Sequence, residues 1–389
     1  MIPGFYHEEH DEFRSVAREF NEREVAPHYA RWHAEHMMDR SVWSQAAEAG
    51  LVGLAIPEEH EGMGLTDYRF RAVLDEEFVR AGHLALGLAL HLQDDWVLPH
   101  LLAYGTDEQK QRWLPAMLAG ELVTSVAFTE PGAGSDLRGV RTKAVREGGH
   151  YVLNGQKTFI GNGISGDAAL VLARTDGGTS PRGDRDSFSL FLVEKKDHEG
   201  YTTGKQLDKM GLQASDTAEL FFDDVLVPAA NLVGEEGKGL DYVTEQLPQG
   251  RLGVAVAAMA VAQGVLAETV EFVSSRDVFG ERVLDFQNTQ FELAEMTAQL
   301  EASQAYVAHC VEVFDRGEFD LVAASKVKLQ ATNTTKDLVD RCLQLHGGFG
   351  YILESSVAQA YTAVRLFTIF GGTDEILKAT VGHHIAAAH

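Results

Sequence analysis

Hydrophobic positions recur at helical spacing near the start of the chain. Apolar side chains repeat at intervals of three and four residues, at Phe13, Val16, Ala17 and Phe20. This spacing predicts an amphipathic helix, and we expect Pro27 to end it. Further helices are predicted over 41–51 and 69–81, and Thr106, followed by acidic residues, indicates another helix start. Residues 1–120 are therefore predicted to form an α-helical N-terminal domain.

The pattern changes to short runs of β-forming residues over 121–233. The pair Asn154-Gly155 separates two such runs and predicts a hairpin, because a two-residue type I′ turn needs positive φ angles. A loop rich in Gly, Ser, Asp and Arg is predicted over 175–185. Further strands are predicted over 168–174, 186–194 and 217–227. Their spacing predicts an antiparallel β-barrel or sandwich domain.

Helical spacing returns over 234–389. Apolar residues from Leu293 to Phe314 mark one face of a long helix, and Gly317 lies past its end. Further helices are predicted over 253–276, 321–345 and 355–367. Four long helices in this length predict a C-terminal four-helix bundle. The expected class is a multidomain α+β protein with domains at 1–120, 121–233 and 234–389.

Charge and composition exclude several classes of function. The 389 residues include 33 Lys and Arg against 58 Asp and Glu, a formal net charge of −25. Such a charge repels nucleic acid and anionic membrane surfaces, and the longest apolar stretch, 253–262, is about half of a membrane span. Two cysteines and scattered histidines predict neither a disulfide framework nor a metal site. We expect a cytoplasmic protein without nucleic-acid or membrane partners.

Candidate chemistry lies in four glycine-rich segments, at 127–136, 159–163, 344–350 and 369–376. Glycine lets backbone N–H groups approach a ligand closely, and Thr129 and Ser135 add hydroxyl groups. A helix start at Thr373 or Asp374 would present further N–H groups to an anion. Each segment alone is equally typical of a loop or a helix cap, so a binding site is indicated by the set and not by any one member.

The order of these and further motifs resembles the acyl-CoA dehydrogenase family over nearly the whole chain. The series runs through FTEPGAGSD (128–136), LNGQKTFI (153–160), KMGLQASDTAEL (209–220), RDVFG (276–280), Phe286-Gln287, QLHGG (344–348) and GGTDEI (371–376). The resemblance implies the three-domain order given above. It also implies a homotetramer, built as a dimer of dimers, that holds FAD between its subunits.

The resemblance also implies a set of ligand contacts. Arg276 suits a pyrophosphate because its guanidinium donates in pairs. The residues implied to contact FAD are Phe128, Thr129, Ser135, Phe159, Ile160, Gly161, Arg276, Gln287, Gln344, Gly347, Gly348, Thr373 and Glu375. Ser135, Arg251 and Gly372 are implied to contact the acyl thioester. At position 161 many members carry a Thr where this chain has Gly.

The implied reaction is α,β-desaturation of an acyl-CoA or acyl-carrier-protein thioester, as in fatty acid metabolism. A base removes an α-proton while the β-hydrogen leaves as hydride to flavin N5, and an electron-transfer flavoprotein or a similar acceptor reoxidises the cofactor. The family base is a Glu desolvated in the acyl cleft. The two positions at which members carry that Glu are Gly250 and Gly371 here.

Two hypotheses from different classes follow from these glycines. In the first, the base has moved to Asp94 or Asp95, of which we favour Asp95. Neighbouring residues on an α-helix point about 100° apart, so only one of the two is expected to face the cleft. In the second, the protein is a flavoprotein that binds acyl thioesters without desaturating them, either a degenerate paralogue or a base-deletion variant. A monooxygenase or nitro-compound oxidase on the same scaffold is a third reading.

A separate prediction concerns the glycine at position 250. Glycine is unfavourable inside a helix by roughly 1 kcal/mol relative to Ala, so Gly250 resembles a replacement more than a structural requirement. We therefore expect Gly250→Glu to restore a base beside the α-carbon. General base catalysis is worth about 10²–10⁴-fold, so a gain in activity of at least about tenfold is expected.

Overall fold

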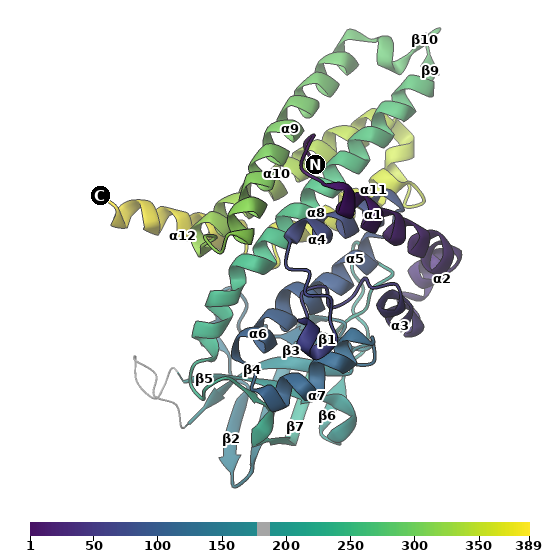
Figure 1. The fold of residues 1–389 in the computed structure, drawn as a ribbon. Coiled ribbons are helices and arrows are strands. Elements are labelled where there is room, and N and C mark those ends of the chain that lie inside the picture. The colour runs from purple at the N-terminus through teal and green to yellow at the C-terminus, as the bar shows by residue number, and fades with distance from the viewer. Residues whose placement is uncertain (177–186) are drawn as a thin grey trace.

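The computed structural model describes residues 1–176 and 187–389, with helices at both ends of the chain and a sheet between them (Figure 1). The N-terminal helices are α1 (Glu8–Phe20), α2 (Ala26–Glu35), α3 (Ser41–Glu48), α4 (Tyr68–Arg80), α5 (Leu84–His91), α6 (Leu98–Tyr104) and α7 (Asp107–Leu118). Thr106 forms the start of α7 as predicted: its Oγ1 accepts from Gln109 N, and its own N–H donates to the Gln109 side chain.

Pro27 does not end a helix, contrary to the prediction. The segment Asn21–Val25 is a π-helical turn that joins α1 directly to α2, and Pro27 lies in the first turn of α2. Proline is tolerated there because the first N–H groups of a helix have no partner inside it. A second π-helical turn, η3 (Leu92–Val97), joins α5 to α6.

The central strands form one mixed sheet in the order β6-β7-β3-β2-β4-β5-β8, with β1 beside β4. The strands are β1 (Thr124–Ala127), β2 (Lys143–Glu147), β3 (His150–Gly161), β4 (Ala168–Thr175), β5 (Phe188–Glu194), β6 (Tyr201–Thr203), β7 (Thr217–Pro228) and β8 (Leu232–Val233). The predicted fold class is confirmed, but β4 pairs in parallel with both β1 and β2. Nearly all of the loop predicted over 175–185 lies outside the described residues.

The predicted hairpin at Asn154-Gly155 is wrong. Strand β3 runs through this pair, and its register with β7 shifts between Leu153 and Gly155, as at a β-bulge. A Cβ atom at Gly155 would lie 2.4 Å from Oγ1 of Thr142, so glycine is required by close backbone approach and not by a turn. The connection between β2 and β3 is made instead by 148–149, where Gly148 has a φ of 61°.

The C-terminal helices are α8 (Gly239–Ser275), α9 (Gln287–Asp315), α10 (Leu321–His346), α11 (Ser356–Val364) and α12 (Asp374–Ala387). Helix α8 packs against α9 and α10 around the largest hydrophobic core. It has the length and apolar composition of a membrane span, but 72% of its most apolar window is buried inside the fold. Helix α12 projects from the body of the protein (Figure 1) and buries only Leu377.

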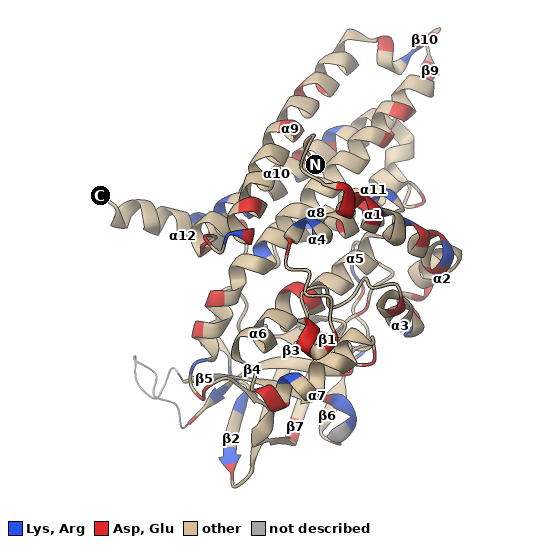
Figure 2. Cartoon of the chain, in the orientation of Figure 1, with Lys and Arg blue, Asp and Glu red and all other residues tan. Residues whose placement is uncertain are grey.

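Charged residues are spread over the molecule. Figure 2 shows acidic positions on α1, α2, α8 and α9, with lysines and arginines interspersed. Among the charged side chains of the sheet, Lys157 on β3 is completely buried. Its Nζ donates to the carbonyls of Phe128 and Leu172 and to Oε1 of Glu130. One ammonium group therefore connects β3, β4 and the segment that follows β1.

We predict that Lys157→Met lowers the free energy of unfolding by about 3–5 kcal/mol, because the change leaves the Glu130 carboxylate buried without its cation. Urea denaturation followed by tryptophan fluorescence measures this difference. Lys143→Met on the neighbouring strand is the matched control, since its ion pair with Asp176 is exposed and worth less than about 1 kcal/mol. Equal shifts for the two variants would contradict the assigned role of Lys157.

Candidate functional site

Two of the predicted segments of the β-domain lie side by side. Thr158 N donates to the carbonyl oxygen of Thr129 over 3.0 Å, which joins the end of β3 to the chain after β1. Phe128 and Ile160 are buried, whereas Phe159 is 71% exposed with a φ of 60°. A non-glycine residue with positive φ is uncommon and typical of functional sites. These two segments therefore present an exposed aromatic ring and a free edge of backbone.

The glycines after Thr129 leave open space beside the same edge. Cβ atoms at Gly132 or Gly134 would meet no atom within 4 Å, and Ser135 is exposed. At Gly161 the reverse holds, since a Cβ atom there would lie 2.6 Å from Cδ1 of Leu92. Leu92 thus takes the space of the side chain that the resemblance leads one to expect at 161.

A second set of predicted residues meets where α8 faces the loop before α12. Arg251 Nε donates to the Gly371 carbonyl, and the Lys328 Nζ donates to the Gly372 carbonyl over 2.8 Å. Burial lowers the pKa of Lys328 to about 7, with a further contribution from the nearby Arg251 charge. Thr373 caps α12, and Glu375 is exposed in the first turn of that helix. Two buried basic side chains therefore fix the backbone at positions 371 and 372.

The indole of Trp96 lies between the two glycines that replace the expected base. A Cβ atom at Gly250 would lie 2.4 Å from Cε2 of Trp96, and one at Gly371 would lie 3.1 Å from its Cη2. The interpretation of Gly250 as dispensable is therefore wrong, because the packing of the indole requires glycine. The expected gain of activity from Gly250→Glu alone is corrected for the same reason: the indole fills the space.

A buried ionic cluster surrounds Asp95. Its Oδ2 bonds to Nδ1 of His91, and its Oδ1 accepts from Nε2 of Gln249 over 3.1 Å. Arg71 Nε lies 3.4 Å from the same carboxylate. Burial by itself raises the pKa of Asp95, but His91, Arg71 and Gln249 outweigh burial and hold this pKa below its ordinary value. Asp95 is thus an ionised carboxylate next to the residue that precedes Gly250.

Asp94 and Asp95 both line one cavity of about 390 Å³, together with Tyr68, Arg71 and Gln249. The prediction that at most one of the two aspartates faces the acyl cleft stays a prediction, because none of the residues predicted to contact FAD or the thioester lines this cavity. Both belong to the π-helical turn η3, in which hydrogen bonds span five residues and neighbouring side chains diverge less than on an α-helix. Asp94 accepts from the Gly53 N–H, and burial raises the pKa of Asp94 to about 7.

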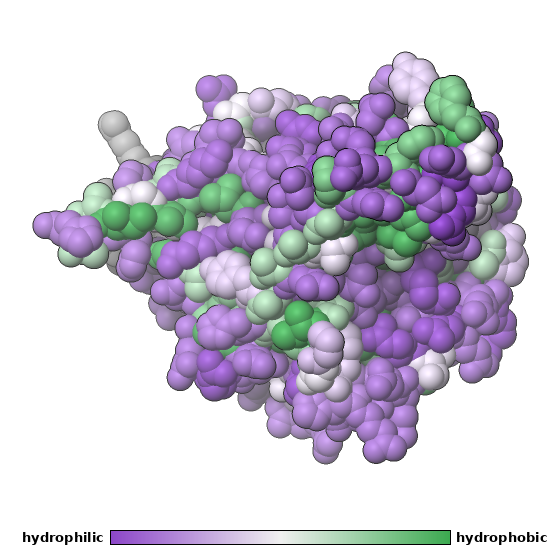
Figure 3. Space-filling view, turned by 90° about the horizontal axis from the view of Figure 1, so that it is seen from above, coloured by the Kyte–Doolittle hydropathy of each residue, from purple (hydrophilic) through white to green (hydrophobic). Residues whose placement is uncertain are grey.

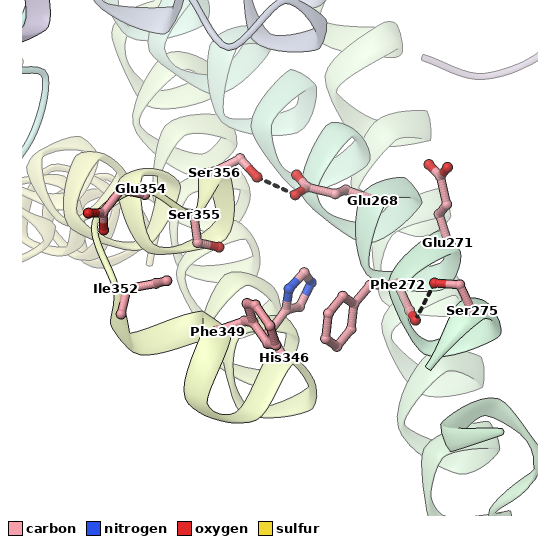
Figure 4. A pocket seen from close by; sticks show the side chains of 10 residues that line it. All are labelled: Glu268, Glu271, Phe272, Ser275, His346, Phe349, Ile352, Glu354, Ser355 and Ser356. Atoms are coloured by element: carbon pink, nitrogen blue, oxygen red, sulfur yellow. Dashed lines mark hydrogen bonds between the residues drawn. The ribbon is translucent and has the colours of Figure 1, made fainter. Parts of the chain in front are cut away.

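The remaining predicted residues gather at the far end of the bundle, and all of them are exposed: Arg276, Gln287, Gln344, Gly347 and Gly348. Cβ atoms at both glycines would meet nothing within 4 Å, which leaves their backbone open to a ligand. A neighbouring cavity of about 480 Å³ is shown in Figure 4, where Phe272 stacks on His346 and Phe349 lies beside it. Three glutamates also line this cavity, so it does not suit a phosphate group.

The structure therefore separates the predicted residues into two places. Arg251 and Arg276 are 25 residues apart on or next to α8, which at 1.5 Å per residue is roughly 37 Å. The strands of the β-domain lie toward the start of α8, and the short β9–β10 hairpin that follows Arg276 lies at its other end (Figure 1).

Sequence reasoning missed several residues of the site: Arg71, His91, Trp96, Gln249 and Lys328. One signal was available, because His91 and Asp95 have the spacing of four residues that brings side chains together on a helix. The contact of Trp96 with Gly250 and Gly371 joins residues that are far apart in the sequence. No local pattern reports such a contact.

Comparisons with known proteins match nearly the whole chain to one protein family. Three domain models match: "Acyl-CoA dehydrogenase, N-terminal domain" over 7–121, "middle domain" over 125–225 and "C-terminal domain" over 237–386. A mouse protein named long-chain specific acyl-CoA dehydrogenase, mitochondrial, is 40% identical and covers 99% of this chain and 88% of its own.

Solved structures give the same result. The crystal structure of an acyl-CoA dehydrogenase from Geobacillus kaustophilus is 40% identical with a TM-score of 0.93, over 98% of this chain and 99% of that chain. That of an acyl-CoA dehydrogenase complexed with FAD from Bacillus anthracis is 29% identical with a TM-score of 0.91. It covers 100% of this chain and 68% of that chain.

The raised pKa of Asp94 predicts a pH-dependent cost to stability. Between about pH 4 and 7 the folded state keeps a proton that the unfolded state has lost, so stability falls as pH rises, by up to about 1.4 kcal/mol per pH unit. Asp94→Asn removes this dependence. Urea denaturation at pH 4.5 and pH 8 is expected to show the variant gaining stability relative to the parent at the higher pH.

Glu19→Gln, an exposed substitution on α1, is the control for this pH series. It is expected to keep a constant difference from the parent at both pH values. A constant difference for Asp94→Asn as well would contradict the raised pKa of Asp94.

Proposed function

This chain belongs to the acyl-CoA dehydrogenase family, and we propose that it desaturates an acyl-CoA thioester with Asp95 as the proton acceptor. The FAD-dependent redox chemistry is that of the family. The single observation that carries the proposal for the base is the position of Asp95. It is an ionised carboxylate on a cavity wall, bonded to the neighbour of Gly250.

The residues present fit FAD. The glycines at 132, 134 and 348 leave their backbone open with no side chain in the way, and the exposed Phe159 ring offers an aromatic face. Arg276 and the start of α12 at Thr373 supply donors for the phosphates. Bound FAD supplies the acceptor for the hydride that leaves the β-carbon.

Asp95 would take the α-proton at Oδ1. A general base must be ionised and must lie within reach of the proton, and geometry is considered before pKa. The oxygen Oδ1 lies 3.1 Å from Nε2 of Gln249 on α8, whereas Oδ2 is held by His91. Asp94 is directed to Gly53 of the N-terminal domain instead. His91 and Gln249 therefore act as positioning residues for the Asp95 carboxylate.

We predict that Asp95→Asn slows flavin reduction by acyl-CoA at least about 100-fold, within the range for loss of a general base. Bleaching of the flavin absorbance under anaerobic conditions measures the rate across a panel of acyl-CoAs. Asp94→Asn is the matched comparison, and a larger loss there would move the base to Asp94. If the parent binds CoA ligands but no acyl-CoA bleaches its flavin, the non-desaturating flavoprotein is the correct reading.

An oligomer would complete the cofactor site. We propose that a second copy supplies the Arg276 group to the FAD that the β-domain segments contact, since α8 separates position 251 from Arg276 by 25 residues. Phe279, Tyr351 and Leu353 are exposed by 99%, 90% and 58%. Figure 3 shows hydrophobic patches among hydrophilic side chains on the upper face of the molecule. We propose a homotetramer that passes electrons to an electron-transfer flavoprotein, in a reducing cytoplasm that suits the free Cys310 and Cys342.

We predict that Arg276→Ala weakens FAD retention by about tenfold or more, since a charged hydrogen bond contributes about 1.5–3 kcal/mol. The measurement is FAD content after gel filtration, with light scattering for the mass. Arg282→Ala on the same hairpin is the control, because Arg282 pairs with Asp285 within one chain. Equal FAD loss in both variants, or none in Arg276→Ala, would refute a cofactor contact across subunits.

A further inference from the structure

We infer that Trp96 excludes a side-chain base from positions 250 and 371 and thereby leaves proton removal to Asp95. This inference rests on the proposed function. Its physical content is steric: one buried indole occupies the space into which a side chain from either glycine would have to project. Trp96 is thus a positioning residue whose size decides where the base of the reaction lies.

The contacts at Gly250 are too close for any side chain. A Cβ atom there would lie 2.4, 2.5 and 2.8 Å from Cε2, Cζ2 and Cδ2 of Trp96, all atoms of the fused ring system. Distances below 3.0 Å require the ring to move as a whole. At Gly371 an added Cβ would lie 3.1 and 3.2 Å from Cη2 and Cζ2 of the same ring, and the φ of 65° disfavours a side chain as well.

The indole is held where it is. Trp96 is 8% exposed, and its Nε1 donates to Nε2 of His91 over 3.1 Å. His91 in turn packs on Gly253, one helical turn beyond Gly250, where a Cβ atom would lie 2.1 Å from its Cε1. The two glycines of α8 therefore seat two rings from the segment that carries Asp95. Moving Trp96 aside would break the hydrogen bond to His91 and disturb the packing of both rings.

A large side chain at position 96 and any side chain at position 250 would therefore occupy the same space, so only one of them can be present. With Trp96 present, glycine is required at 250 and the base must come from η3. With a small residue at 96, a carboxylate at 250 has room to approach the α-carbon. A Glu in that apolar space would be desolvated, which favours proton acceptance near neutral pH.

The first test is a stability cycle that needs no substrate. Gly→Ala inside a helix ordinarily stabilises a protein. We expect Gly250→Ala to lower the Tm in the parent, because the new Cβ meets the indole, and to raise the Tm in a Trp96→Ala background. Gly264→Ala, farther along α8, is the control and is expected to shift the Tm equally in both backgrounds. A rise in Tm from Gly250→Ala in the parent overturns the inference.

The second test moves the base. Trp96→Ala, Gly250→Glu and Asp95→Asn are combined, and flavin bleaching by butyryl-CoA and octanoyl-CoA is followed over pH 5.5–9. We expect Gly250→Glu alone to gain nothing. The triple variant is expected to exceed the Trp96→Ala/Asp95→Asn pair by at least about tenfold, with a rate that rises with pH through the titration of the new carboxyl.

The outcomes separate the inference from the proposed function. A triple variant that keeps FAD, binds CoA and shows no gain overturns the inference. A gain in Gly250→Glu with Trp96 intact overturns it as well. If the parent is inactive but the triple variant bleaches, the role of Trp96 is upheld and the assignment of Asp95 as the native base fails.

Discussion

The close approach of helix α8 to the π-helical turn 92–97 is the constraint on which the rest of the site depends. Glycines at 250 and 253 allow Trp96 and His91 to lie directly against the α8 backbone. The same indole reaches Gly371, whose carbonyl is held by Arg251. Three segments far apart in the sequence are thereby fixed around one ring. Because buried side chains are packed at crystal-like density, a change in size at any of these positions must be answered at another.

Next to this contact, the local environment gives two neighbouring aspartates different pKa values. Asp94 and Asp95 share a cavity, yet the pKa of Asp94 is raised to about 7 and that of Asp95 is lowered. Burial acts on both. The Arg71 charge lowers both pKa values. The difference arises because Asp95 also bonds to His91 and Gln249, whereas the charge of Asp95 further raises the pKa of Asp94. Adjacent carboxylates of one turn thus differ in protonation at neutral pH, which is the usual way in which active sites separate roles.

The length of α8 keeps two groups of the predicted residues apart. Arg251 lies in the first half of α8 and Arg276 lies just past its end, so the helix holds these two predicted ligand contacts apart. The exposed aromatic side chains and the projecting helix α12 are features that an assembly would cover.

The sequence by itself determined the order of helical and β-domains, most of the long helices and the family. These depend on local spacing, caps such as Thr106, and motifs that are contiguous in the chain. It did not determine that Asn154-Gly155 is a bulge within β3, that Pro27 lies in the first turn of α2, or that 92–97 is π-helical. It also did not show that Gly250 seats Trp96. The physical reason is common to all: local propensity allowed several conformations, and contacts with distant residues, such as Thr142 against Gly155, selected one.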